Sequence, residues 1–145
     1  LVLPAITTPG YDYRVINVEV QKQLPGSLLN WHRQMLTCRR LLPALRHGDF
    51  ELLDSNHPSV IVFTRTIDNM TVLIAANLSS AGASLSLDLS KWKGARAREV
   101  LWGCEYPPVG PNWFIYLPSY GFRWWLIGEV GTDDLAEEKI EKVNA

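Results

Sequence analysis

Residues 60–76 read VIVFTRTIDNMTVLIAA, and this stretch decides the fold class. Two runs rich in β-branched residues, 60–65 and 71–76, flank the dipeptide Asp68-Asn69. β-Branched side chains favour extended backbone, whereas Asp and Asn are typical of tight turns. The stretch therefore predicts a β-hairpin whose two strands are joined by a turn at residues 68–69.

Further segments on both sides of this hairpin have the pattern of strands. Leu85, Leu87 and Leu89 alternate with polar residues, which predicts a strand with one buried face and one solvated face. Four shorter segments also suit strands: 50–53, 98–102, 113–117 and 122–127. Short strands separated by turn residues predict a mainly β domain, an antiparallel sandwich or barrel.

Residues 27–42 have a helical period instead. Apolar residues recur there at spacings of three and four: Leu28, Trp31, Met35, Cys38 and Leu42. Ser27 is the expected N-cap, and Pro43 interrupts the pattern. The sequence therefore predicts one amphipathic helix before the strands, with an apolar stripe that packs on a core. Without a covering partner, the stripe predicts self-association into a homo-oligomer.

The two ends of the chain have a different character. Residues 1–16 show no sustained period and predict an irregular entry segment. The polar tail, residues 129–145, begins with acidic residues at 133 and 134 and carries Lys139 and Lys142 later. This charge order suits a short C-terminal helix.

Composition excludes several classes of partner. The 14 basic and 15 acidic residues nearly cancel, so the charge pattern indicates neither nucleic acid nor an anionic membrane as a partner. No apolar run approaches the roughly 20 residues that span a bilayer. Two distant cysteines, Cys38 and Cys104, do not make a disulfide framework, which favours a cytoplasmic location.

The sequence contains no recognisable catalytic, metal or cofactor motif. The three histidines, at 32, 47 and 57, have no companion nucleophile or metal-ligand spacing. The carboxylates mostly flank turns and strand ends, where solvated acids are expected. We therefore predict no catalytic residue, no metal site and no cofactor.

Aromatic residues are abundant, with six tryptophans and a concentration between residues 102 and 125. Aromatic rings can stack on sugars, and this pattern makes Trp113, Tyr120 and Trp125 candidate carbohydrate contacts. The alternative is that the rings fill a small β-core. Because Trp124 and Trp125 are adjacent in a strand, they must point to opposite faces, and one of them belongs to the core.

Four segments, taken in order, resemble the C-terminal end of trehalose synthases in glycoside hydrolase family 13, the α-amylase superfamily. They are GYDYRVINVEVQ (10–21), SLLNWHRQML (27–36), ANLS (76–79) and LPSYGFRW (117–124). The resemblance implies a layout of three parts. Residues 1–47 would end a (β/α)8 barrel, residues 48–128 would form the C-terminal antiparallel β-sandwich, and residues 129–145 would follow as a tail.

The same resemblance implies that the chain is a non-catalytic C-terminal fragment with a stabilising role, because the family's catalytic carboxylates lie upstream of Leu1. Its partner would be the upstream catalytic barrel, through which maltose is converted to trehalose by a retaining double displacement. Two alternatives remain open: a carbohydrate-binding module for α-glucans, and the C-terminal domain of an oligo-1,6-glucosidase-like hydrolase.

The resemblance also gives three candidate residues near the substrate of the parent enzyme. Tyr11, Tyr13 and Asn17 would lie on a loop that leaves a barrel strand, where such active sites are lined. An alternative interpretation of Asn17 is that it caps a short helix that extends through Gln21.

Overall fold

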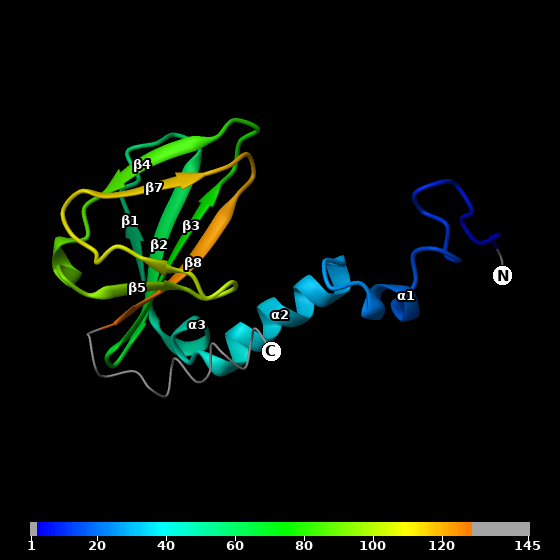
Figure 1. Cartoon of the computed structure of the whole chain (residues 1–145), viewed down its shortest axis with the longest axis horizontal. Coiled ribbons are helices and arrows are strands. Elements are labelled where there is room, and N and C mark those ends of the chain that lie inside the picture. The colour runs from blue at the N-terminus through cyan, green and yellow to red at the C-terminus, as the bar shows by residue number, and fades with distance from the viewer. Residues whose placement is uncertain (1–2, 129–145) are drawn as a thin grey trace. The chain divides into compact units, whose positions relative to one another are not determined.

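The computed structural model describes residues 3–128, which belong to two compact units that divide between Thr37 and Cys38 (Figure 1). The first unit contains α1 (Val18–Gln23) and most of α2 (Leu28–Leu41). The second contains the end of α2, the short helix α3 (Ala44–His47) and all the strands of the described chain. The boundary expected at residues 47–48 stays a prediction about the parent's domains.

Side-chain caps define the helices of the first unit. Asn17 Oδ1 accepts a hydrogen bond from the Val20 N–H at 3.0 Å, and α1 begins at the next residue. Ser27 Oγ accepts one from the Asn30 N–H at 3.2 Å, so the predicted N-cap of α2 is confirmed. Each cap satisfies one of the N–H groups that a helix start leaves without an intrahelical partner.

The strands of the second unit form two antiparallel sheets. The larger has six strands in the order β1-β2-β3-β8-β5-β6. Their bounds are β1 (Asp49–Leu53), β2 (Val60–Ile67), β3 (Met70–Asn77), β8 (Phe122–Gly128), β5 (Arg96–Glu99) and β6 (Glu105–Tyr106). The smaller sheet pairs β4 (Ala83–Leu87) with β7 (Trp113–Leu117), and the 3-10 turn η1 (Ser90–Trp92) follows β4.

The predicted hairpin is confirmed. β2 and β3 pair from Val60↔Asn77 to Ile67↔Met70, which leaves Asp68 and Asn69 as the turn. Asp68 has a positive φ of 51°, a left-handed conformation that aspartate tolerates better than most residues.

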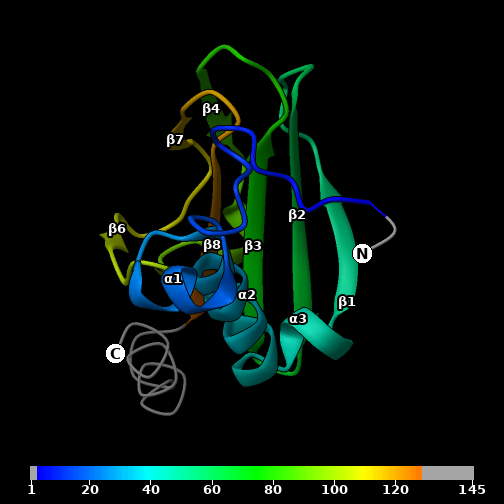
Figure 2. The same cartoon turned by 90° about the vertical axis from the view of Figure 1, so that its right-hand side faces the viewer.

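The hydrophobic core lies between the two sheets, with β4 and β7 as a separate layer beside the larger sheet (Figure 2). Alternate residues of β4 and β7 are buried, as the period of two predicted for the leucines requires. They meet the inward-facing side chains of β2, β3 and β8, including Val62, Leu73 and Trp125. The antiparallel β-sandwich class is therefore confirmed.

Three details differ from the sequence-based expectations. The strand expected at 98–102 is β5 at Arg96–Glu99, because the chain turns after Glu99 and the Gly103 N–H donates back to the Glu99 carbonyl at 3.0 Å. Leu89 is buried but lies beyond β4. β6 is too short to have a sequence signature. The helix expected in the tail lies outside the described residues.

No helix within residues 3–128 is long and apolar enough to cross a membrane.

Candidate functional site

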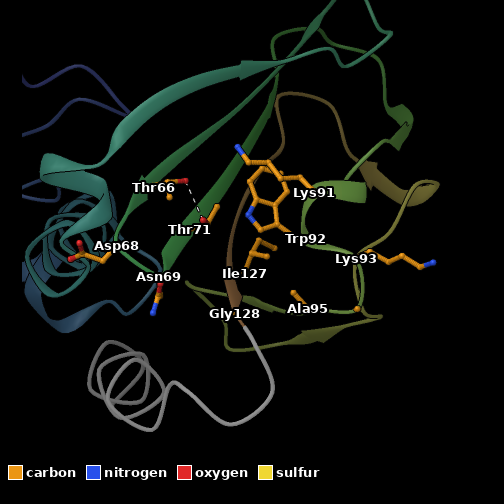
Figure 3. A pocket seen from close by; sticks show the side chains of 11 residues that line it. Thr66, Asp68, Asn69, Thr71, Lys91, Trp92, Lys93, Ala95, Ile127 and Gly128 are labelled. Atoms are coloured by element: carbon orange, nitrogen blue, oxygen red, sulfur yellow. Dashed lines mark hydrogen bonds between the residues drawn. The ribbon is translucent and has the colours of Figure 1, made fainter.

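A cavity of about 520 Å³ lies where the β2–β3 turn approaches η1 and the end of β8 (Figure 3). Trp92 forms one wall, and Thr66 and Thr71 lie opposite with their hydroxyls 3.1 Å apart. Among the described lining residues, Asp68 supplies the one carboxylate. Cleavage of a glycosidic bond normally uses two carboxyl groups, so these lining residues do not provide that chemistry.

The Trp92 ring in this cavity is already engaged. The Lys91 ammonium lies 4.9 Å from the ring centroid and also pairs with Glu51 at 2.8 Å. Trp92 itself packs against the hydrophobic core. A sugar would have to displace Lys91 to stack on this ring, which makes the cavity a poor carbohydrate site.

Glu99 is a fully buried carboxylate of the larger sheet, at 1% exposure. Burial raises its pKa, and backbone N–H groups led by that of Trp102, at 2.6 Å from Oε2, oppose the rise. Oε1 has no hydrogen-bond partner among the described residues. Because Glu99 does not line the described cavity, its contacts indicate a structural role in the turn after β5.

Two of the predicted carbohydrate contacts, Trp113 and Trp125, are buried in the core, so they cannot contact a sugar at the surface. Trp113 and Trp125 are 4% and 0% exposed, and their rings meet edge to face at 5.1 Å inside the core. Trp113 Nε1 also donates to the Pro107 carbonyl at 3.0 Å. Neither ring presents a face to a ligand, so the alternative interpretation, that these rings fill the core, is the correct one for this pair. Tyr120 is exposed, on a turn where its φ is 50°.

The exposed aromatics of β7 are Phe114 and Tyr116, at 66% and 60%. Neither ring was among the candidate contacts expected from the sequence. The alternation of residues in β7 could have identified this exposed face. Residues 113, 115 and 117 are Trp, Ile and Leu, which suit a core, whereas Tyr116 on the other face carries a hydroxyl that suits solvent.

Among the N-terminal candidates, Tyr11 and Tyr13 are exposed. Asn17 uses its whole side-chain amide locally: Oδ1 caps α1, and Nδ2 donates to the Tyr13 carbonyl at 3.1 Å. The interpretation of Asn17 as a helix cap is therefore confirmed, whereas proximity to a substrate stays a prediction.

Cys38 and Cys104 are both free thiols. Cys38 is fully buried, and this burial raises its pKa to about 11, whereas Cys104 is exposed. Within residues 3–128 no group of three His, Cys, Asp or Glu side chains is placed to hold a metal ion.

The face of the larger sheet that points away from the core carries two apolar rows, which we call the outer rows. Paired residues on neighbouring antiparallel strands point to the same face, so the rows follow from the register. The first crosses β1, β2, β3 and β8 as Leu52, Phe63, Ile74 and Trp124. The second crosses β2, β3 and β8 as Ile61, Ala76 and Phe122.

The outer rows end in exposed apolar side chains. Leu52 is 63% exposed and Ile61 39%. α3 lies at the other end of β2, where the Arg65 guanidinium donates to the Ala44 carbonyl at 3.4 Å. The exposed Leu52 and Ile61 thus place apolar side chains of two adjacent rows at the surface of this face.

Comparison with known proteins agrees with this description. Residues 50–124 match the family model of the maltogenic amylase C-terminal domain. The chain is 37% identical over 131 residues to a trehalose synthase/amylase of Mycobacterium tuberculosis, which covers 88% of the chain and 22% of that relative. An oligo-1,6-glucosidase of Heyndrickxia coagulans is 32% identical over 81 residues, 56% of the chain and 15% of that relative.

Among solved structures, an Anoxybacillus α-amylase superimposes with a TM-score of 0.66 at 25% identity, over 86% of the chain and 26% of the amylase. This chain thus spans about a quarter or less of the proteins that it matches. The matched family covers most of the β-sandwich, from β1 into β8. The chain belongs to the family of maltogenic amylase C-terminal domains.

Proposed function

We propose that this chain is the non-catalytic C-terminal fragment of an enzyme of the trehalose synthase type, and that its β domain stabilises the enzyme by packing its outer rows on the catalytic domain. The observation that carries the proposal is the open apolar end of these rows at Leu52 and Ile61. Similarity to a trehalose synthase over 88% of the chain supports the choice of enzyme. The oligo-1,6-glucosidase alternative is weaker, because that similarity covers 56% of the chain.

In this proposal the upstream barrel supplies the catalytic carboxylates and converts maltose to trehalose in the cytoplasm. Residues 1–47 complete that barrel, residues 48–128 form the β domain, and Tyr11 and Tyr13 lie close to the substrate. Catalysis by the upstream barrel is consistent with the cavity lining of this chain, where Asp68 is the one carboxylate among the described residues.

Burial of the outer rows provides a physical reason for stabilisation. A Leu, Ile or Phe side chain that moves from water to a packed interface contributes about 1.5–3 kcal/mol. Leu52 is 63% exposed and Ile61 39%, so their remaining exposed area equals about one side chain, and docking would gain roughly 1.5–3 kcal/mol from the two together. Net stabilities of about 5–15 kcal/mol make this a substantial contribution.

Incubation of the purified chain with maltose tests the absence of catalysis. We expect neither trehalose nor glucose, whereas a longer polypeptide with the upstream catalytic domain forms trehalose. Formation of either product by the 145-residue chain would overturn the proposal.

The double variant Leu52→Lys, Ile61→Lys tests the docking face. In the 145-residue chain we expect the melting temperature to change little, because both side chains are exposed, and binding of a hydrophobic dye to fall. In the longer polypeptide we expect a clear loss of thermal stability, because two ammonium groups would be buried. The control is Leu78→Lys, at a residue that is 68% exposed and lies outside the rows. Equal melting temperatures for the double and control variants in the longer polypeptide would contradict docking through this face.

Self-association through the α2 stripe stays a separate prediction, which sedimentation velocity of the chain tests. The second candidate function, a module that binds α-glucans, is favoured by the exposed rings of β7 at Phe114 and Tyr116.

A further inference from the structure

The smaller sheet has an outer face of its own. Its core-facing side chains on β7, at residues 113, 115 and 117, are buried, so Phe114 and Tyr116 point outward. The register pairs Phe114 with Ser86 and Tyr116 with Ser84. Both serines are exposed, and the outward face therefore consists of two aromatic rings beside two small hydroxyl side chains.

Two features leave the space beside these rings open. Serine side chains are short, so nothing on β4 stands above the rings of β7. In addition, Tyr116 extends across the start of β4: a Cβ on Gly82 would collide with the Tyr116 hydroxyl, and it would lie 2.9 Å from the ring carbon that bears this hydroxyl. Glycine at position 82 thus lets the phenol ring lie against the backbone of the neighbouring strand.

The charge and the size of this face indicate which class of ligand it could bind. The four outward residues carry no charge, which disfavours an ionic ligand. Rings two residues apart on one strand lie about 7 Å from each other, and a five-residue strand extends about 17 Å. Two strands are about 10 Å wide, so the platform covers less than a quarter of the roughly 800 Å² per partner that a stable protein interface buries.

We propose that Phe114 and Tyr116, with Ser84 and Ser86, form a platform that binds a neutral oligosaccharide chain of α-linked glucose. Sugar rings present apolar C–H faces to the two aromatic rings, and their hydroxyls meet the serine and tyrosine hydroxyls. The platform lies on the smaller sheet, apart from the outer rows, so a failure of docking through those rows would not affect it. The choice of α-linked glucose as the sugar rests on the proposed enzyme type.

Titration calorimetry of the whole chain with maltoheptaose tests the proposal. We expect weak but measurable binding that the double variant Phe114→Ala, Tyr116→Ala weakens about tenfold or more. Phe50→Ala is the matched control, because Phe50 is 57% exposed on β1, on the other sheet. The melting temperature of each variant shows whether it folds.

A second pair of variants keeps both rings and changes only the space beside them. Ser86→Leu places a bulky side chain beside Phe114 and should weaken binding, whereas Ser80→Leu, at an exposed loop position, should not. The proposal is overturned if the chain does not bind maltoheptaose, if the double variant binds as tightly as the unmodified chain, or if Phe50→Ala causes an equal loss. Dimer formation that Phe114→Ala abolishes, without sugar binding, would show that a second copy occupies the face instead.

Discussion

At the scale of single residues, Asn77 joins two loops of the sandwich, the one after β3 and the one after β7. It is 2% exposed, and its Nδ2 donates to the carbonyls of Ala81 at 2.6 Å and Pro118 at 3.0 Å. Its Oδ1 accepts from the backbone N–H of Ser79 at 3.1 Å. A planar amide that both donates and accepts satisfies all of these contacts at once.

We therefore predict that Asn77→Asp destabilises the chain by about 2–4 kcal/mol, because a carboxylate cannot donate to two carbonyls and would be buried with its charge. Urea unfolding measures this change. Ser80→Ala, at an exposed position in the same loop, is the control and should change the unfolding free energy by less than about 0.5 kcal/mol. Equal effects of the two substitutions would show that the amide contacts do not contribute.

Glu99 gives a prediction about pH. Burial raises its pKa in the folded chain above the ordinary value of 4.5, so ionisation costs more free energy in the folded state than in the unfolded state. The contribution of Glu99 to stability is therefore fully present below pH 4.5 and is lost as pH rises through the folded pKa.

The variant Glu99→Gln lacks this titration and keeps an oxygen that accepts the Trp102 N–H. We expect its unfolding free energy, relative to the unmodified chain, to increase between pH 4 and pH 8. Denaturant unfolding at several pH values measures the difference, with far-UV circular dichroism as the control for folding. A difference that stays constant over this range, or decreases with pH, would contradict the raised pKa.

At the scale of elements, Asn30 connects the two helices of the first unit. Its Nδ2 donates to the carbonyls of Gln21 at 3.0 Å, Lys22 at 3.2 Å and Leu24 at 2.9 Å, at the C-terminal end of α1. Carbonyls at the end of a helix lack intrahelical partners, and Asn30 satisfies them here together with Ser27, whose Oγ donates to the Gln21 carbonyl at 2.6 Å. A helix of six residues is too short to persist without such contacts.

Substitution Asn30→Ala should therefore release α1 while α2 remains. Hydrogen exchange of the amides in residues 20–23 measures the release, and we expect these amides to exchange at least tenfold faster than in the unmodified chain. The control is His32→Ala, because the His32 ring contacts only its own helix through the Leu28 carbonyl, within the described interactions. If Asn30→Ala leaves exchange in α1 unchanged, the caps at Asn17 and Ser27 are sufficient by themselves.

At the scale of the whole molecule, the two thiols report on unfolding. Cys104 is exposed, whereas Cys38 is fully buried in the second unit and has a pKa of about 11. We predict that one thiol reacts rapidly with a disulfide reagent in the native chain and that both react in denaturant. Cys104→Ser is the control and should leave no rapidly reacting thiol; rapid reaction of Cys38 in that variant would show that its burial is incomplete in solution.

The sequence predicted the local parts of this fold well and the candidate sites less well. Ser27 was found as a cap, and the β2–β3 turn at Asp68-Asn69 was found from its residue types. The exposed rings of β7, Phe114 and Tyr116, were not among the candidates, whereas Trp113 and Trp125, which were, are buried. Aromatic composition indicates that rings are present, but it does not distinguish a ring in the core from a ring on the surface.

The sequence by itself determined the elements whose stability depends on near neighbours: the hairpin, the capped helices and the alternation in β4. Only the tertiary structure decided which side of β7 is buried, because a period of two defines two faces but the position of the opposing sheet selects one of them. Only the tertiary structure also decided the contacts of Asn77, because its hydrogen bond to Pro118 joins residues 41 positions apart. The outer rows likewise depend on the tertiary structure, because they form only when four strands pair in register.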